Sequence, residues 1–311
     1  MKHRVIFLGT PKIAARCLQA LLDTDVEVVG VITKPDKPVG RKQDIVLNPV
    51  KILALKHHLP VFQPIKMNEI YEKISSLKPD LMLSCAYGQL IPESVLQIPK
   101  FHCVNIHTSL LPRWRGGAPI HWAILKRDVE SGVTMMFMVK ELDAGDIIYQ
   151  TKVKIEASET YRSLYDKLES ISYQMIVEKI HNLFNENVPR IKQDVKQVTI
   201  AKNISRDDEK IHWDTNAVDI EAKVRGLFDQ PIAYTMYENL NVKIIEAHTV
   251  ASENDVNHCG EIIDINKEGI FVNTAKGTLI ITKLQLPSRK PTVVKDMLNG
   301  NHPFKINSIF S

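Results

Sequence analysis

An amide and an imidazole lie two residues apart in the segment Asn-Ile-His-Thr-Ser-Leu-Leu-Pro, residues 105–112. Alternate residues of a β-strand point to the same side, so Asn105 and His107 would leave the end of a strand facing one space. A carboxamide can donate a hydrogen bond to a developing oxyanion, and a histidine can move protons near neutral pH. The spacing therefore indicates acyl or formyl transfer. Taken singly, His107 could be a capping or core histidine and Asn105 a turn former.

A carboxylate elsewhere in the chain offers the histidine a partner. The segment Leu-Asp-Ala-Gly-Asp, residues 142–146, stands between two predicted strands, 132–139 and 147–153. Asp143 in this turn could orient His107 and keep it protonated. An Asx turn is the structural alternative for Asp143.

Length and composition describe a globular protein with two domains. The chain has 311 residues, about twice a typical domain, with 44% hydrophobic and 24% charged residues. The first apolar run, Val5–Leu8, is too short for the core of a signal peptide. No run approaches the ~18 apolar residues that span a membrane. We therefore expect a cytoplasmic protein that does not contact a membrane.

The cysteines and histidines show no metal-ligand spacing. Cys17, Cys85, Cys103 and Cys259 are scattered, and no pair has the spacing of a metal finger or a redox motif. The other histidines also lack such spacing. We therefore expect no metal.

Residues 1–185 alternate short apolar runs with helical patterns. Strands are predicted at 4–8, 28–32, 81–84 and 104–106, and helices at 11–22, 49–58, 68–77, 118–126 and 160–184. Thr10 is the expected N-cap of the first helix, with Pro11 at its first position. This alternation predicts an α/β, Rossmann-like parallel sheet covered on both faces. Ligands of such sheets bind beyond the carboxyl ends of the strands, where Asn105 and His107 would lie.

The remainder of the chain has a different pattern. The polar segment 186–204 contains Pro189 and is predicted to link the catalytic domain, 1–185, to a C-terminal domain, 205–311. That domain has a predicted helix and then closely spaced strands, which indicate a small OB-like β-barrel. The helix is expected at 216–227 and the strands at 232–237, 241–249, 260–265, 269–273 and 278–286.

Charge is distributed unevenly along the chain. The net charge is +4, but residues 1–204 carry 28 Lys and Arg against 21 Asp and Glu, whereas residues 205–311 carry 12 against 15. An anionic partner would therefore be held mainly by the first part of the chain and the junction.

Several motifs together resemble a known enzyme family. Residues 105–120 (NIHTSLLPRWRGGAPI), with LDAGDI, FLGTP and CAYGQLIP, are similar to the formyltransferases that use 10-formyltetrahydrofolate. The segments KPDKPVGR, NPVK, VFQP and IHWDTNAVDIEAKVRGL extend the resemblance to the methionyl-tRNA formyltransferase family along essentially the whole chain. The first motif is specific for the superfamily, and the flanking segments are specific for the tRNA enzymes.

The resemblance implies a direct formyl transfer to the α-amine of methionine on initiator tRNA. Asn105 would hold the formyl oxygen and stabilise the tetrahedral oxyanion. His107, as imidazolium, would add charge stabilisation and deliver a proton. Asp143 would keep His107 charged and, through a water, help to remove the amine proton.

The resemblance also implies where folate binds. Ser109, Leu110, Leu111 and Pro112 match the folate-binding segment of the family. The backbone of Gln89, Leu90 and Ile91, with that of 139–142, would flank the pterin. The structural alternative is that Leu110 and Leu111 only anchor the loop to the core.

The resemblance also implies that the basic loop 34–42 contacts the acceptor end of tRNA, with Arg41 and Lys42 as the binding residues. A solvated surface loop is the alternative. The chain departs from the family pattern after this loop, where Gln43–Leu47 is less basic, and at Ile232, where an aromatic residue is expected.

We expect a monomer. Two other functions remain open: formyl transfer to a small amine, such as glycinamide ribonucleotide or an amino sugar, and a folate- or RNA-binding module that has lost catalysis. The intact Asn105, His107 and Asp143 argue against the second.

Overall fold

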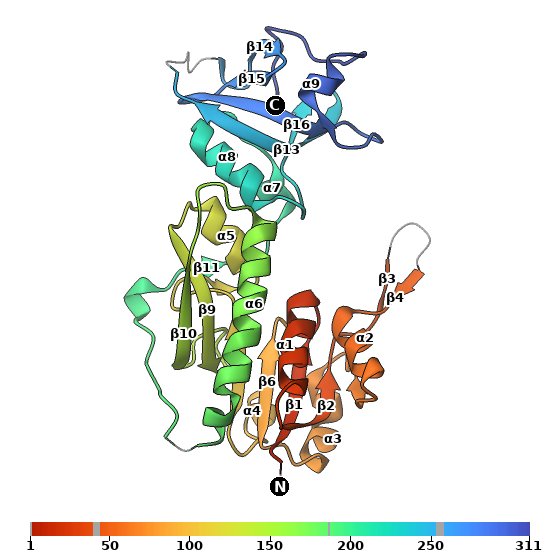
Figure 1. The fold of residues 1–311 in the computed structure, drawn as a ribbon, viewed down its shortest axis with the longest axis vertical. Helices are drawn as coiled ribbons and strands as arrows, with labels where there is room; N and C mark the ends of the chain where they lie inside the picture. The colour runs from red at the N-terminus through yellow and green to blue at the C-terminus, as the bar shows by residue number, and fades with distance from the viewer. Residues whose placement is uncertain (1, 40–43, 186, 253–257) are drawn as a thin grey trace. The chain divides into compact units, whose positions relative to one another are not determined.

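The computed structural model describes residues 2–39, 44–185, 187–252 and 258–311 (Figure 1). They form two compact units. Unit 1 comprises Met1–Pro119, Ser131–Val153 and Asp166–Lys202, and unit 2 comprises Ile120–Glu130, Lys154–Tyr165 and Asn203–Ser311. The expected domain division at 185 and 205 stays a prediction.

Unit 1 is built on a sheet in which the described strands follow the order β10-β9-β7-β6-β1-β2-β5. Their bounds are β1 Arg4–Gly9, β2 Glu27–Ile32, β5 Val61–Phe62, β6 Leu81–Cys85, β7 Cys103–His107, β9 Glu130–Phe137 and β10 Ile147–Lys154. Neighbouring strands are parallel from β7 through β6, β1 and β2 to β5, whereas β9 pairs antiparallel with β7. The predicted α/β, Rossmann-like parallel sheet is confirmed.

Helices cover both faces of this sheet. On one face, Ile6 of β1 and Met82 of β6 pack in one cluster with Ile74 and Val95. The other face carries α1 and α6, which lie in front of the strands in Figure 1. These two helices are joined by a 2.7 Å hydrogen bond from Tyr173 to Asp23, at the C-cap of α1. The bounds are α1 Lys12–Leu22, α2 Pro49–Lys56, α3 Tyr71–Ser76, α4 Glu93–Leu96 and α6 Tyr161–Lys179, with 3-10 turns at Met67–Ile70, Ile180–Phe184 and Val195–Gln197.

Two local predictions for unit 1 were wrong. Helix α1 begins at Lys12 with Pro11 at the N-cap position, and no side chain caps it. The hydroxyl of Thr10 instead donates to the carbonyl of Tyr87, at 3.4 Å. The segment expected as a basic loop contains a hairpin, because β3 (Lys37–Val39) pairs antiparallel with β4 (Asp44–Val46).

Unit 2 contains an antiparallel sheet in the order β12-β13-β16-β15-β14, with β17 on β16. The C-terminal residues bond to both sides of this sheet, since Met236 donates to Ser311 and Ile262 donates to Ser308, each at 2.8 Å. The expected small β domain is confirmed. The helices and strands of unit 2 are α5 Pro119–Leu125, α7 Arg206–Glu209, α8 Ala217–Gly226, β12 Tyr234–Tyr237, β13 Leu240–Val250, β14 Ile262–Asn266, β15 Gly269–Asn273, β16 Thr278–Gln285, β17 Thr292–Val293 and α9 Val294–Met297.

An aromatic cluster supports the β domain. Tyr237 and Phe310 are fully buried in its core, and the ring of Phe310 stacks on Trp213 with centroids 5.5 Å apart. Large rings bury much apolar area, so this cluster stabilises the closure by the C-terminal residues. None of the described helices has the length and apolarity to cross a membrane.

Candidate active site

The last residues of β7 carry the amide and the imidazole. Neighbouring strands fix this strand end on both sides, because Asn105 pairs with Ser84 of β6 and His107 pairs with Thr134 of β9. Ile106, between them, is buried in the opposite direction, as the alternation of a strand requires. His107 is only 6% exposed, and Asn105 is half-buried. A rigid strand therefore presents both groups at the carboxyl edge of the sheet.

Asp143 approaches both side chains from the loop between β9 and β10. Its Oδ1 lies 3.4 Å from the amide nitrogen of Asn105, and its Oδ2 lies 3.6 Å from Nδ1 of His107. The backbone N–H of Gly116 also donates to Oδ2, at 2.9 Å. The structure thus brings Asn105, His107 and Asp143 together, although they are 38 residues apart in sequence at the widest.

Oxygen atoms lie close to both ring nitrogens of His107. Nε2 of His107 lies 2.8 Å from the carbonyl oxygen of Trp114. A carbonyl oxygen only accepts, so Nε2 carries a proton. Nδ1 faces the carboxylate of Asp143. Both ring nitrogens therefore face oxygen atoms, which fix the orientation of the ring.

The loop that carries Asp143 has a backbone that few residues tolerate. Asp143 itself has a φ of 50°, in the left-handed region that Asp and Asn adopt more readily than most side chains. A Cβ on Gly145 would lie 1.9 Å from the carbonyl oxygen of Phe137. Glycine is therefore required at 145, and the Leu-Asp-Ala-Gly-Asp segment follows from the shape of the loop.

The segment after β7 is held by the hydroxyl of Thr134. This hydroxyl donates to the carbonyl of Ser109 at 2.6 Å and accepts from the backbone N–H of Leu111 at 3.2 Å. Ser109 is buried and donates to the carbonyl of Arg113. The side chain of Leu111 packs against Met136 in the core. Leu111 therefore does anchor the loop, while Leu110 and Pro112 are partly exposed.

The loop after β6 alternates buried and exposed side chains. Ile91 is buried, whereas Leu90 is 75% exposed. Gln89 accepts a hydrogen bond from the hydroxyl of Tyr87 at 3.3 Å. Burial raises the pKa of Tyr87 to about 12, so this phenol stays neutral. Gln89 and Ile91 are fixed by the protein, and Leu90 between them presents an apolar side chain outward.

Comparison with known proteins places the chain in a family. A formyl transferase model matches residues 1–180, and a model of the formyl transferase C-terminal domain matches residues 203–302. The chain belongs to the formyl transferase family.

Relatives with names are similar along nearly the whole length. The methionyl-tRNA formyltransferase of Malacoplasma penetrans (strain HF-2) is 42% identical over 303 residues, which cover 97% of this chain and 95% of the relative. That of Desulforamulus reducens is 42% identical over 299 residues, with 96% and 94% covered. The predicted family resemblance is confirmed.

Solved structures share the fold. An N-formyltransferase from Helicobacter canadensis, solved with folinic acid and dTDP-3-aminofucose, has a TM-score of 0.66 at 22% identity, with 90% of this chain and 99% of that chain covered. HypX from Aquifex aeolicus, solved with tetrahydrofolic acid, has a TM-score of 0.64 at 17% identity. The match covers 96% of this chain but only 47% of HypX.

The two residues predicted to contact tRNA, Arg41 and Lys42, lie outside the described residues of this formyltransferase. The hairpin leading to them is anchored at its base by Asp36, which accepts hydrogen bonds from Lys51 and Gln63. The bond from Lys51 lowers the pKa of the Asp36 carboxyl. An acidic residue of the basic segment is therefore already paired within the protein.

Sequence reasoning missed the segment 190–201, which was assigned only as a linker. It packs along the candidate active site of unit 1. Ile191 forms an isolated antiparallel β-bridge with Ile147, and β11 (Ile200–Ala201) pairs in parallel with β8 (Arg115–Gly116). Its Gln193 bonds to the loop of Asp143. Polar composition gave no signal for these contacts, because most are made to backbone atoms.

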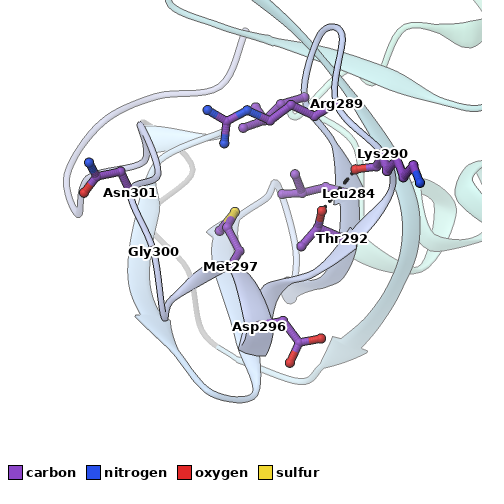
Figure 2. Close-up of a pocket in the computed structure, with 9 residues that line it drawn as sticks. Leu284, Arg289, Lys290, Thr292, Asp296, Met297, Gly300 and Asn301 are labelled. Atoms are coloured by element: carbon purple, nitrogen blue, oxygen red, sulfur yellow. Dashed lines mark hydrogen bonds between the residues drawn. The ribbon is translucent and has the colours of Figure 1, made fainter.

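Unit 2 carries a separate hollow rimmed by cations. Figure 2 shows the side chain of Arg289 extending to one side and that of Lys290 to the other, with Leu284 and Thr292 between them, and Asp296 is also part of the lining. Its volume is about 240 Å³, room for a side group rather than a whole drug-sized ligand. A 2.8 Å hydrogen bond from Gln285 to the carbonyl of Arg289 fixes the loop.

In the part of the chain that the structure describes, no group of three or more His, Cys, Asp or Glu residues is placed to hold a metal ion.

Proposed function

We propose that this formyltransferase moves the formyl group of 10-formyltetrahydrofolate to the α-amino group of methionine on initiator tRNA. The observation that carries the chemistry is the meeting of Asn105, His107 and Asp143 at the carboxyl edge of the sheet. The acceptor is proposed from the relatives named methionyl-tRNA formyltransferase, which match nearly the whole chain.

The proposed reaction is a direct transfer through a tetrahedral intermediate. The methionine nitrogen attacks the formyl carbon, the new C–N bond forms, and the bond from this carbon to N10 of the folate breaks. The amine loses a proton and N10 gains one. The amide of Asn105, which has a second N–H besides the one facing Asp143, donates to the oxyanion. The charge of a protonated His107 stabilises the same oxygen.

Asp143 has two tasks in this scheme. Its carboxylate stabilises the imidazolium of His107 and accepts, through a water, the proton of the attacking amine. The proton bound to Nε2 of His107 is held by the carbonyl of Trp114. For this proton to reach N10, the Nε2–H of His107 must leave the carbonyl of Trp114 and donate to the folate instead.

We place the folate along Ser109, Leu110, Leu111 and Pro112, with Gln89 and Ile91 on the other side. The exposed Leu90 and Leu142 supply apolar surface for the pterin and aminobenzoyl rings. Two proteins of the same fold were solved with folates, which supports this class of ligand.

We propose that Arg41 and Lys42 contact the acceptor end of the tRNA, and that Arg289 and Lys290 bind a phosphate elsewhere on it. An arginine can clamp a phosphate or stack on an unpaired base. The enzyme is proposed to act in the cytoplasm, as a monomer.

A competition among three amines tests the function. The full chain receives 10-formyltetrahydrofolate with charged initiator tRNA, glycinamide ribonucleotide or an amino sugar. We expect formyl-methionyl-tRNA as the main product. Formylation of only a small amine would move the enzyme to the alternative function. Folate binding without turnover of any amine would indicate a binding module.

A further inference from the structure

The side chain of Gln193 ties together the two loops that hold the carboxylate of Asp143. Its amide nitrogen donates to the carbonyl of Asp143 at 2.9 Å and to that of Gly145 at 2.8 Å. Its amide oxygen accepts from Nε and Nη2 of Arg115, at 2.9 and 2.7 Å. We propose that Gln193 is a positioning residue for formyl transfer that acts through Asp143. This inference rests on the proposed function of Asp143.

Glutamine suits this place because all four of its hydrogen bonds are used. The amide group has two donor hydrogens and two acceptor lone pairs. Both donors meet carbonyl oxygens and both lone pairs meet one guanidinium, so the side chain has a single orientation. A glutamate at 193 would keep the bonds from Arg115 but place a carboxylate oxygen against two carbonyl oxygens. The NH₂ group of the amide is therefore what makes glutamine fit position 193 and glutamate not.

The two loops meet again at the carboxylate itself. Gly116, next to Arg115, donates its N–H to Oδ2 of Asp143. Gln193 therefore fixes Asp143, which carries the carboxylate, and Arg115, whose neighbour Gly116 orients that carboxylate. The left-handed φ of 50° at Asp143 is a conformation that needs such external support. Loss of the amide would let the carboxylate shift relative to His107, and a shift of about 1 Å can cost about 100-fold in rate.

Steady-state kinetics of Gln193→Ala and Gln193→Glu test the proposal, with Gln197→Ala as the matched control. Gln197 lies on the same segment, is exposed, and donates from its amide to Asp194, at 2.8 Å, on that segment. Both Gln193 variants are expected to lower kcat at least tenfold, with the KM values for folate and tRNA within about twofold of wild type. Gln197→Ala should match the wild type in kcat. Circular dichroism and thermal melts establish that each variant is folded.

A double-mutant cycle with Asp143→Asn separates positioning from a general structural role. If Gln193 acts through the carboxylate, then Gln193→Ala should cost less than about twofold in kcat once Asp143 is already Asn. A full tenfold loss in that background would overturn the inference. If Gln193→Ala keeps the kcat of the wild type while Asp143→Asn is impaired, the inference about Gln193 is overturned and the proposed function of Asp143 stands. Wild-type kcat in Asp143→Asn would overturn both it and the proposed function of Asp143.

Discussion

Two regions of unit 1 hold Asp143 in different ways, one at its carboxylate and the other at its backbone carbonyl. The end of β7 reaches Asp143 from a strand that is paired on both sides and mostly buried. The segment 190–201 reaches the backbone carbonyl of Asp143 from a largely irregular stretch with few buried side chains, in which Ile191 is 58% and Val195 78% exposed. The strand end carries the groups proposed to touch substrate, and the exposed segment only places their partner. Groups that need fixed geometry lie on the element with the highest local stability.

The comparison sets the order of expected effects. On the proposed mechanism, loss of a group at the end of β7 removes an interaction with the transition state itself. Loss of a contact from the segment 190–201 only loosens a partner. Loss of charges in unit 2 changes substrate binding and leaves the chemistry intact.

The largest effect is expected at the strand end. His107→Ala and Asn105→Ala should each lower kcat at least ~100-fold, because one preorganised donor to an oxyanion contributes about 3 kcal/mol. His57→Ala is the control, since His57 is an exposed histidine of unit 1 that follows α2. Single-turnover assays with charged tRNA give the rate, and circular dichroism checks the fold. A folded His107→Ala with near wild-type kcat would remove His107 from the mechanism.

A smaller loss is expected at Asp143. Asn keeps the size of Asp and tolerates the left-handed backbone, so Asp143→Asn removes the charge with little change of shape. Without that charge His107 and Asn105 lose the carboxylate that orients them, and kcat should fall at least ~10-fold. Asp146→Asn, in the same loop, is the control and should retain activity. Equal rates for Asp143→Asn and wild type would contradict the role of the carboxylate.

Thr134→Val is expected to act on folate binding rather than on chemistry. The hydroxyl of Thr134 bonds to Ser109, Leu111 and Gln150, and valine has the same shape without the hydroxyl. Breaking these buried bonds should lower the free energy of unfolding by about 1–3 kcal/mol. Because the loop of Ser109 loses its support, the KM for 10-formyltetrahydrofolate should rise several-fold with the KM for tRNA unchanged.

The exposed Thr151 on β10 gives a matched control, Thr151→Val, which should affect neither quantity. Denaturant unfolding and folate titrations measure the two effects separately. An unchanged KM for folate in a destabilised Thr134→Val would show that the loop of Ser109 does not shape the folate site.

Much of the fold was predictable from local pattern. The strand expected at 241–249 is β13, Leu240–Val250, because alternation and flanking turns mark a half-buried strand. The approach of Asp143 to His107 was expected from the two loops, but the shape that requires Gly145 became visible only in three dimensions.

Other features could not be predicted from residue types. Thr10 fits the N-cap pattern, yet Pro11 takes that place and the hydroxyl bonds to a carbonyl brought close by folding. Gln193 donates to backbone carbonyls, which every residue possesses, and its side-chain partner Arg115 lies 78 residues away in the sequence. A polar segment that serves as a linker and one that supports a site have the same composition.

The smallest effect is expected in the hollow of unit 2. Reversing both rim charges, with Arg289→Glu and Lys290→Glu, should raise the KM for tRNA several-fold at low salt and leave the KM for folate unchanged. The difference from wild type should shrink as salt rises, because each lost phosphate contact lowers the salt dependence of binding. Lys267→Glu with Lys276→Glu makes the same change of net charge at exposed residues that do not line the hollow. Equal losses in both double variants would assign the effect to the overall field of unit 2, whereas a loss confined to the first would assign it to the hollow.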